Sequence, residues 1–225
     1  MADRVERRLA LQTERGAALE ARLRRLLAPL AGDERVLDVG CGTGAFAYAI
    51  APLVGEVVGV DRSTEYIAAA REHAPDGCSF VEGDATSLPF PYGGFDLVGC
   101  LRVLHHVGRP ELVVSELVRV TRPGGRILVA DQLGDVDPLR SLELDRVERA
   151  RDPSHTRLLP DADIRGYLDA NDLVVTANEI VRERRDVDRY LDLVGLEGAE
   201  RDRVARLVPA VLEVDVGWYL ARKPL

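Results

Sequence analysis

Three glycines at alternate positions, Gly40, Gly42 and Gly44, form the part of the sequence best suited to approach a ligand closely. They follow a short apolar run, 36–39, and a helical pattern begins directly after them. Glycine permits a sharp turn and has no Cβ to hold a ligand away, and the start of a helix offers unpaired N–H groups. Because Gly40, Gly42 and Ala45 also satisfy the dinucleotide-binding pattern, a nicotinamide enzyme and a plain tight turn both remain open.

Three carboxylates lie at the ends of three successive expected strands: Asp38, Asp61 and Asp84. A carboxylate at Asp61 can accept hydrogen bonds from both hydroxyls of a ribose, or it can cap the helix that follows. Asp84 can accept an adenine amino hydrogen or serve only as a turn residue. Together the three positions favour nucleoside binding without distinguishing one nucleoside cofactor from another.

Histidine is the side chain whose ordinary pKa, near 6.5, suits a general base at neutral pH. His105 and His106 follow the expected fourth strand, and His155 lies in a later polar segment between two arginines. His105 and His155 are the two candidate catalytic bases. The alternatives are that His105 and His106 pack against the following loop and that His155 is an exposed loop residue.

The elements that must position these residues alternate between short apolar strands and amphipathic helices. Such alternation predicts parallel β-α-β units and a doubly wound sheet that binds ligands at the carboxyl ends of its strands. The pattern predicts strands over 36–39, 57–60, 79–82, 95–101 and 126–131, and helices over 3–30, 46–53, 64–73 and 110–121.

Beyond residue 131 the alternation breaks down. The pattern there predicts helices over 137–150, 161–171, 186–194 and 198–213, and strands over 173–182 and 214–221. Segments 134–160 and 183–212 are candidates for a lid. The expected organisation is one domain, with a helical cover (1–34), a cofactor-binding core (35–133) and a lid with the rest of the sheet (134–225).

Composition restricts the partners and the compartment. The chain has 225 residues and a net charge of -8, and an acidic protein repels nucleic acid phosphates. No apolar run reaches the roughly 18 residues that a membrane span needs, and the charged N-terminus does not look like a signal peptide. Cys41, Cys78 and Cys100 form neither a disulfide framework nor a zinc motif. We therefore expect a cytoplasmic protein with no metal, no nucleic acid and no membrane partner, as a monomer or homodimer.

Five segments in order resemble the class I S-adenosylmethionine-dependent methyltransferases, particularly the small-molecule group related to ubiquinone and menaquinone methyltransferases. The resemblance covers about residues 35–131, and the ordered set is far more specific than any one motif. The segments are VLDVGCGTG (36–44), GVDRS (59–63), GDATSLPF (83–90), FDLVGCLRVLHHV (95–107) and RVTRPGGRILVAD (119–131). A less specific similarity to uncharacterised bacterial relatives covers 151–157 and the final WYLARKP, and suggests a segment placed over the substrate.

The resemblance implies a Rossmann-like, seven-stranded, mostly parallel sheet with an antiparallel last strand, an N-terminal helix and helical lid insertions. It implies that the glycines line the methionine half of the cofactor, that Asp38 orients its amino group, that Asp61 holds the ribose and that Asp84 reads the adenine. The full set of implied cofactor residues is Asp38, Gly40, Cys41, Gly42, Gly44, Asp61, Arg62, Ser63, Asp84, Ala85, Cys100 and Leu101.

The resulting hypothesis is an enzyme that transfers a methyl group from S-adenosylmethionine to oxygen, nitrogen or carbon of a small molecule, with S-adenosylhomocysteine as product. Methyl transfer requires mainly alignment of the nucleophile with the methyl group, and a base where the nucleophile carries a proton. The alternatives are an NAD(P)-dependent oxidoreductase on a Rossmann fold and a non-catalytic cofactor-binding protein.

Overall fold

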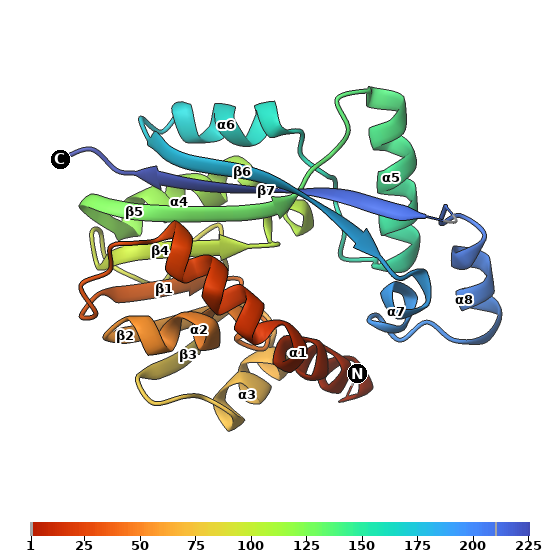
Figure 1. Ribbon diagram of the computed structural model, residues 1–225, viewed down its shortest axis with the longest axis horizontal. Coiled ribbons are helices and arrows are strands. Elements are labelled where there is room, and N and C mark those ends of the chain that lie inside the picture. Colours follow the sequence, from red (N-terminus) through yellow and green to blue (C-terminus); the bar gives the residue numbers. More distant parts are fainter. Residues whose placement is uncertain (1, 210) are drawn as a thin grey trace.

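A seven-stranded sheet forms the centre of the computed structural model, which describes residues 2–209 and 211–225 (Figure 1). Its strand order is β3-β2-β1-β4-β5-β7-β6. The strands are β1 (Arg35–Val39), β2 (Glu56–Asp61), β3 (Cys78–Glu82), β4 (Phe95–Leu101), β5 (Thr121–Gln132), β6 (Val174–Arg185) and β7 (Leu212–Arg222). Neighbours among β1 to β5 pair in parallel, whereas β7 runs antiparallel to both β5 and β6.

Helices cover both faces of this sheet, as expected for a doubly wound fold (Figure 1). One apolar core includes side chains of α1, α2 and α3, and the other includes side chains of α4 and α6. Figure 1 shows α5, α7 and α8 together beyond one end of the sheet. The helices are α1 (Ala2–Leu26), α2 (Ala45–Ile50), α3 (Thr64–Glu72), α4 (Pro110–Val120), α5 (Pro138–Arg151), α6 (Asp161–Asp169), α7 (Val187–Asp192) and α8 (Gly198–Ala205), with 3-10 turns η1 (Ala51–Leu53) and η2 (Leu104–His106).

Adjacent residues of β7 pack into opposite cores, as the two-residue period of a strand requires. Trp218 and Leu220 belong to the core under α1 and α2, whereas Tyr219 and Ala221 belong to the core under α4 and α6. The last strand is therefore buried on both faces between β5 and β6.

The predicted alternation, the seven strands and the antiparallel last strand are confirmed. The predicted helix 3–30 ends at Leu26, because Pro29 has no N–H to donate and disfavours helical backbone in the residue before it. The predicted helix 198–213 is wrong beyond Ala205. Leu212, Val214 and Val216 are all buried in β7, and their spacing of two is the strand period.

Two further boundaries differ from the sequence-based expectation. Thr121, expected at the end of a helix, begins β5 and donates its hydroxyl to the Leu117 carbonyl oxygen at 2.6 Å. Strand β6 continues to Arg185, so the beginning of the expected lid segment 183–212 belongs to the sheet. None of the helices in the described ranges is both long and apolar enough to cross a membrane.

Gly99 in β4 is a place where the sheet tolerates no side chain, since a Cβ there would lie 2.6 Å from Cζ of Phe46. We expect Gly99→Ala to lower the free energy of unfolding by about 1–3 kcal/mol, the usual cost of overpacking a core. Gly16→Ala is the matched control, because a Cβ at Gly16 in α1 meets nothing within 4 Å and alanine favours a helix by roughly 0.5–1 kcal/mol. Urea unfolding of both variants measures the difference, and equal stabilities would contradict this account of the core.

Candidate functional site

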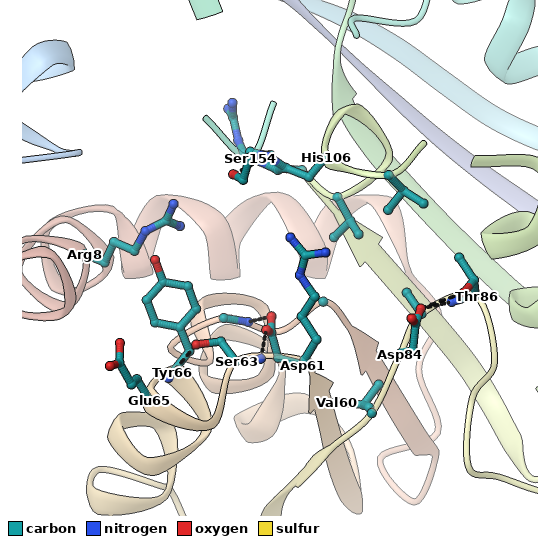
Figure 2. A pocket seen from close by; sticks show the side chains of 18 of the residues that line it. Arg8, Val60, Asp61, Ser63, Glu65, Tyr66, Asp84, Thr86, His106 and Ser154 are labelled. Carbon is teal, nitrogen blue, oxygen red and sulfur yellow. Dashed lines mark hydrogen bonds between the residues drawn. The ribbon is translucent and has the colours of Figure 1, made fainter. Parts of the chain in front are cut away.

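A cavity of about 430 Å³ opens at the carboxyl ends of the parallel strands. This is where open α/β sheets bind ligands, next to the point where the strand order reverses. Figure 2 shows Asp61 and Ser63 on one side of it, Asp84 and Thr86 on another, and His106 beside Ser154. The lining residues are Arg4, Val5, Arg8, Gly40, Gly42, Val60, Asp61, Arg62, Ser63, Glu65, Tyr66, Gly83, Asp84, Ala85, Thr86, Arg102, Val103, His106, Val107, Gly108 and Ser154.

The turn between β1 and α2 requires its glycines for two different reasons. Gly40, Gly42 and Gly44 all have positive φ angles, of 69°, 53° and 92°, a region that other residues rarely adopt. A Cβ at Gly40 would collide with Val103, whereas one at Gly42 would meet nothing within 4 Å. Because Gly42 borders the cavity, its missing side chain leaves space in which a ligand can approach the backbone.

Asp61 joins this turn to the end of β2. The Gly42 N–H donates to its Oδ2 at 2.8 Å, and the Ser63 N–H donates to its Oδ1 at 2.9 Å. The residue that caps α3 is Ser63, whose Oγ accepts from the Tyr66 N–H, so the alternative that Asp61 is a helix cap is wrong. Each carboxylate oxygen has further acceptor capacity, which suits a pair of ligand hydroxyls.

Asp84 is both a turn residue and a residue of the cavity wall. The backbone N–H and the hydroxyl of Thr86 donate to its Oδ1 at 2.8 and 2.7 Å. These hydrogen bonds hold the pKa of Asp84 below its usual value, so the carboxylate is ionised at neutral pH. The hydrogen bonds from Thr86 engage Oδ1 alone, and the turn therefore does not use up the acceptor capacity of the side chain.

Five of the residues implied by the resemblance do not line the cavity: Asp38, Cys41, Gly44, Cys100 and Leu101. Asp38 is 2% exposed, and its Oδ2 accepts from the Ala47 N–H in the first turn of α2 at 3.1 Å. Burial raises the pKa of the Cys41 and Cys100 thiols, which makes both poor nucleophiles. The other seven, Gly40, Gly42, Asp61, Arg62, Ser63, Asp84 and Ala85, line it together.

Three histidine rings gather next to the cavity. The ring centre of His105 lies 4.1 Å from that of His106 and 5.7 Å from that of His155. His105 Nδ1 is hydrogen-bonded to Asp131 Oδ1, and His155 Nε2 lies 2.8 Å from Asp145 Oδ1. Both candidate bases are buried and neither lines the cavity, whereas His106 does.

Helix α1 supplies three cavity residues that were not predicted individually: Arg4, Val5 and Arg8. The Arg8 guanidinium lies over the Tyr66 ring, 5.2 Å from its centre. The sequence predicts a helical cover over 1–34, but an amphipathic helix rich in arginine gives no signal that selects these positions. Of the two candidate lid segments, 134–160 contributes Ser154, and no described residue of 183–212 lines the cavity.

Arg102 is a further residue that sequence reasoning missed. It follows β4 with a φ of 60°, a conformation uncommon for a residue with a side chain. Its Nη2 donates to both carboxylate oxygens of Glu183 in β6 at 2.9 Å. Arg102 thus has a strained backbone and lines the cavity. Strained residues of this kind cluster at active sites and ligand-binding sites.

Asp38 makes the stability of the fold sensitive to pH. Burial raises the pKa of Asp38 to about 7, so the folded chain binds this proton more tightly than the unfolded chain does. The side chain therefore costs stability increasingly as the pH rises from about 4 to 7. Asp38→Asn keeps an oxygen for the Ala47 N–H and removes the charge.

We expect the stability of Asp38→Asn relative to the wild type to increase between pH 5 and pH 8. The increase should exceed about 1.4 kcal/mol, the equivalent of one pKa unit. Urea unfolding at several pH values measures it, with Asp76→Asn at an exposed position as control. A difference that stays constant with pH would show that Asp38 ionises normally.

The sequence of this chain is similar to those of known methyltransferases. A family model described as a methyltransferase domain matches residues 37–129. The uncharacterized methyltransferase YcgJ of Bacillus subtilis is 35% identical over 145 residues, which are 63% of this chain and 57% of YcgJ. A demethylmenaquinone methyltransferase of Beutenbergia cavernae is 45% identical over 98 residues, 44% of this chain and 40% of that protein. The chain thus spans about half the length of these two relatives.

Solved structures agree over nearly the whole chain. The crystal structure of Bacillus subtilis YcgJ has a TM-score of 0.82 and 26% identity, and the match covers 92% of this chain and 98% of that one. A geranyl diphosphate methyltransferase solved in complex with S-adenosylmethionine has a TM-score of 0.70 over 92% of this chain and 85% of that one. Its identity is 17%, so this likeness concerns the fold alone.

Proposed function

Because this chain belongs to the class I S-adenosylmethionine-dependent methyltransferases, we propose that it transfers a methyl group from that cofactor to oxygen, nitrogen or carbon of a small-molecule acceptor. One observation carries the proposal. Gly42, Asp61 and Asp84 come from three different strand ends and border the same cavity. The relatives indicate which cofactor is used, and the cavity contains side chains suited to the parts of that cofactor.

The residues that would hold the cofactor fit its shape and charge. The open space at Gly42 admits the methionine half against the backbone of the turn. Asp61 would accept the two ribose hydroxyls, and Asp84, beside Ala85, would accept the adenine amino group. Arg62 and Ser63 would flank the adenosine. When bound, the cofactor supplies a methyl group activated by a sulfonium, so the chain has mainly to align an acceptor with it.

The remaining residues implied by the resemblance would act from behind the cavity wall. Asp38 would fix the first turn of α2. It would act on the cofactor amino group indirectly, through the backbone of the glycine turn or through a water molecule. Gly44 and Cys41 would shape the turn. Cys100 and Leu101, at the end of β4, would form the floor beneath the cofactor. A catalytic role for His105 or His155 stays a prediction. Each ring is hydrogen-bonded to a buried carboxylate, and neither residue lines the cavity.

A small-molecule acceptor is the substrate class that the cavity suits best. The cavity volume of about 430 Å³ lies within the range of small-molecule sites, roughly 300–1,000 Å³, and it would have to hold the cofactor as well as the reacting end of the acceptor. The net charge of -8 opposes binding of nucleic acid. The name of the Beutenbergia cavernae relative also describes a methyltransferase of a small molecule.

Calorimetric titration with S-adenosylhomocysteine, and with NADH in parallel, tests the cofactor directly. We expect micromolar binding of S-adenosylhomocysteine, because the acidic strand ends suit its nucleoside. We expect no binding of NADH, because the relatives of this chain are methyltransferases. Binding of NADH alone would instead support the oxidoreductase alternative. Cofactor binding without turnover of any acceptor would support the non-catalytic one.

Asp61 is the side chain on which affinity should depend most. We expect Asp61→Ala to weaken S-adenosylhomocysteine binding at least tenfold, because hydrogen bonds to a charged group contribute about 1.5–3 kcal/mol each. Asp76→Ala, an exposed acid away from the cavity, is the matched control. Circular dichroism must show that the Asp61 variant is folded, since the side chain also holds the turn. Unchanged affinity in a folded variant would refute the ribose contact.

A further inference from the structure

We infer that His106, rather than His105 or His155, takes the acceptor's proton during methyl transfer, with Ser154 and Asp152 fixing its tautomer. The inference rests on the proposed function and narrows it. It identifies the methylated group of the acceptor as a hydroxyl or an N–H, a nucleophile that still carries a proton when it binds.

The position of His106 is the first step. It is the one histidine among the described residues that lines the cavity, and Figure 2 shows it next to Ser154. Its side-chain hydrogen bond engages Nδ1, which lies 3.0 Å from Ser154 Oγ. Nε2 is therefore the ring nitrogen left to face an acceptor.

Hydrogen-bond donors and acceptors then determine the tautomer. A serine hydroxyl has a single proton to donate, and Ser154 Oγ donates it to Asp152 Oδ1 at 2.7 Å. Towards His106, Ser154 Oγ is consequently an acceptor, so Nδ1 must carry the ring proton. In a neutral ring with the proton on Nδ1, Nε2 has a free lone pair.

Asp152 has to be ionised for this arrangement, and its surroundings ensure that it is. Its side chain is buried, yet Arg4 Nη2 of α1 lies 2.6 Å from its Oδ2. Burial raises the pKa of Asp152, but the Ser154 hydrogen bonds and the Arg4 guanidinium outweigh this and hold it at about 2. Arg4, Asp152 and Ser154 thus form a chain of contacts that ends at His106.

The ring of His106 is also neutral at physiological pH. Burial and the neighbouring His105 lower the pKa of His106 to about 4. A neutral ring can accept a proton, and the acceptor's proton becomes more acidic as its oxygen or nitrogen bonds to the methyl carbon. His105, 4.1 Å away between ring centres, is itself fixed by Asp131 and supports the His106 ring from one side.

The reaction balances with these groups. A lone pair on the acceptor oxygen or nitrogen forms a bond to the methyl carbon, and the sulfur–methyl bond breaks with its electron pair remaining on sulfur. The acceptor's proton passes to His106 Nε2, so the positive charge lost at sulfur reappears on the imidazole. Val103 and Val107 line the same cavity and would hold the carbon skeleton of the acceptor.

Long-range ¹H–¹⁵N NMR of the full chain, labelled at histidine, tests the tautomer at pH 7 without any acceptor. We expect the proton of His106 on Nδ1. In Ser154→Ala this preference should be lost, and in Ser154→Thr, which retains a hydroxyl, it should persist. A proton on Nε2 in the wild type, or a tautomer that does not respond to Ser154→Ala, would overturn the inference.

Kinetics tests the role of the proton acceptor. Release of S-adenosylhomocysteine is measured with S-adenosylmethionine and a panel of phenols, alcohols, amines, carboxylic acids and thiols. His106→Asn is the sharpest variant, because its amide N–H can still donate to Ser154 Oγ while nothing replaces Nε2. We expect turnover to fall by at least about a hundredfold, the usual contribution of a general base, while S-adenosylhomocysteine affinity changes less than about threefold.

The outcomes separate this inference from the proposed function. If the wild type does not bind S-adenosylhomocysteine, the proposed function fails whatever the tautomer of His106. If it binds and His106→Asn turns over as fast as the wild type, only the role of His106 fails. Turnover confined to carboxylic acids would also overturn it, because these groups are already ionised at neutral pH and need no base.

Discussion

The two hydrogen bonds that Asp61 accepts are the constraint on which the cavity depends. One comes from Gly42 in the turn after β1 and the other from Ser63 at the start of α3, so one carboxylate sets two strand ends and a helix start relative to each other. Backbone N–H groups at such positions must find partners. A side chain that satisfies them also presents its remaining lone pairs to a ligand, and structure and recognition therefore use the same group.

The opposite wall is assembled from parts that are distant in the sequence. Arg4 in α1 contacts Asp152 after α5, 148 residues further along the chain, and Thr156 donates to the His105 carbonyl oxygen. Neither segment contributes a strand to the sheet. Their contacts place Ser154 against His106, so the geometry of the imidazole depends on how α1 and the segment after α5 pack against the sheet.

The fold was predictable because its signals are local. Apolar strands, glycine turns and amphipathic helices repeat from residue 36 to 131, and each can be recognised within a short window. Seven of the twelve implied cofactor residues line one cavity for the same reason, since they follow strand ends. The role of Ser154, the left-handed backbone at Arg102 and the contact of Arg4 depend on tertiary packing, and no local pattern encodes them. Leu212, by contrast, did carry a local signal, the spacing of two that it shares with Val214 and Val216, and it pairs with Arg185 of β6.

The position of β6 at the edge of the sheet bears on how the protein avoids self-association. A long open edge offers unpaired backbone groups to strands of other molecules, and charged side chains along the edge discourage such pairing. β6 extends over 12 residues and carries Glu179, Arg182, Glu183, Arg184 and Arg185, while the opposite edge, β3, has only 5. The charges of β6 therefore disfavour pairing of this long edge with strands of other molecules, and Glu183 among them also holds Arg102 of the cavity wall.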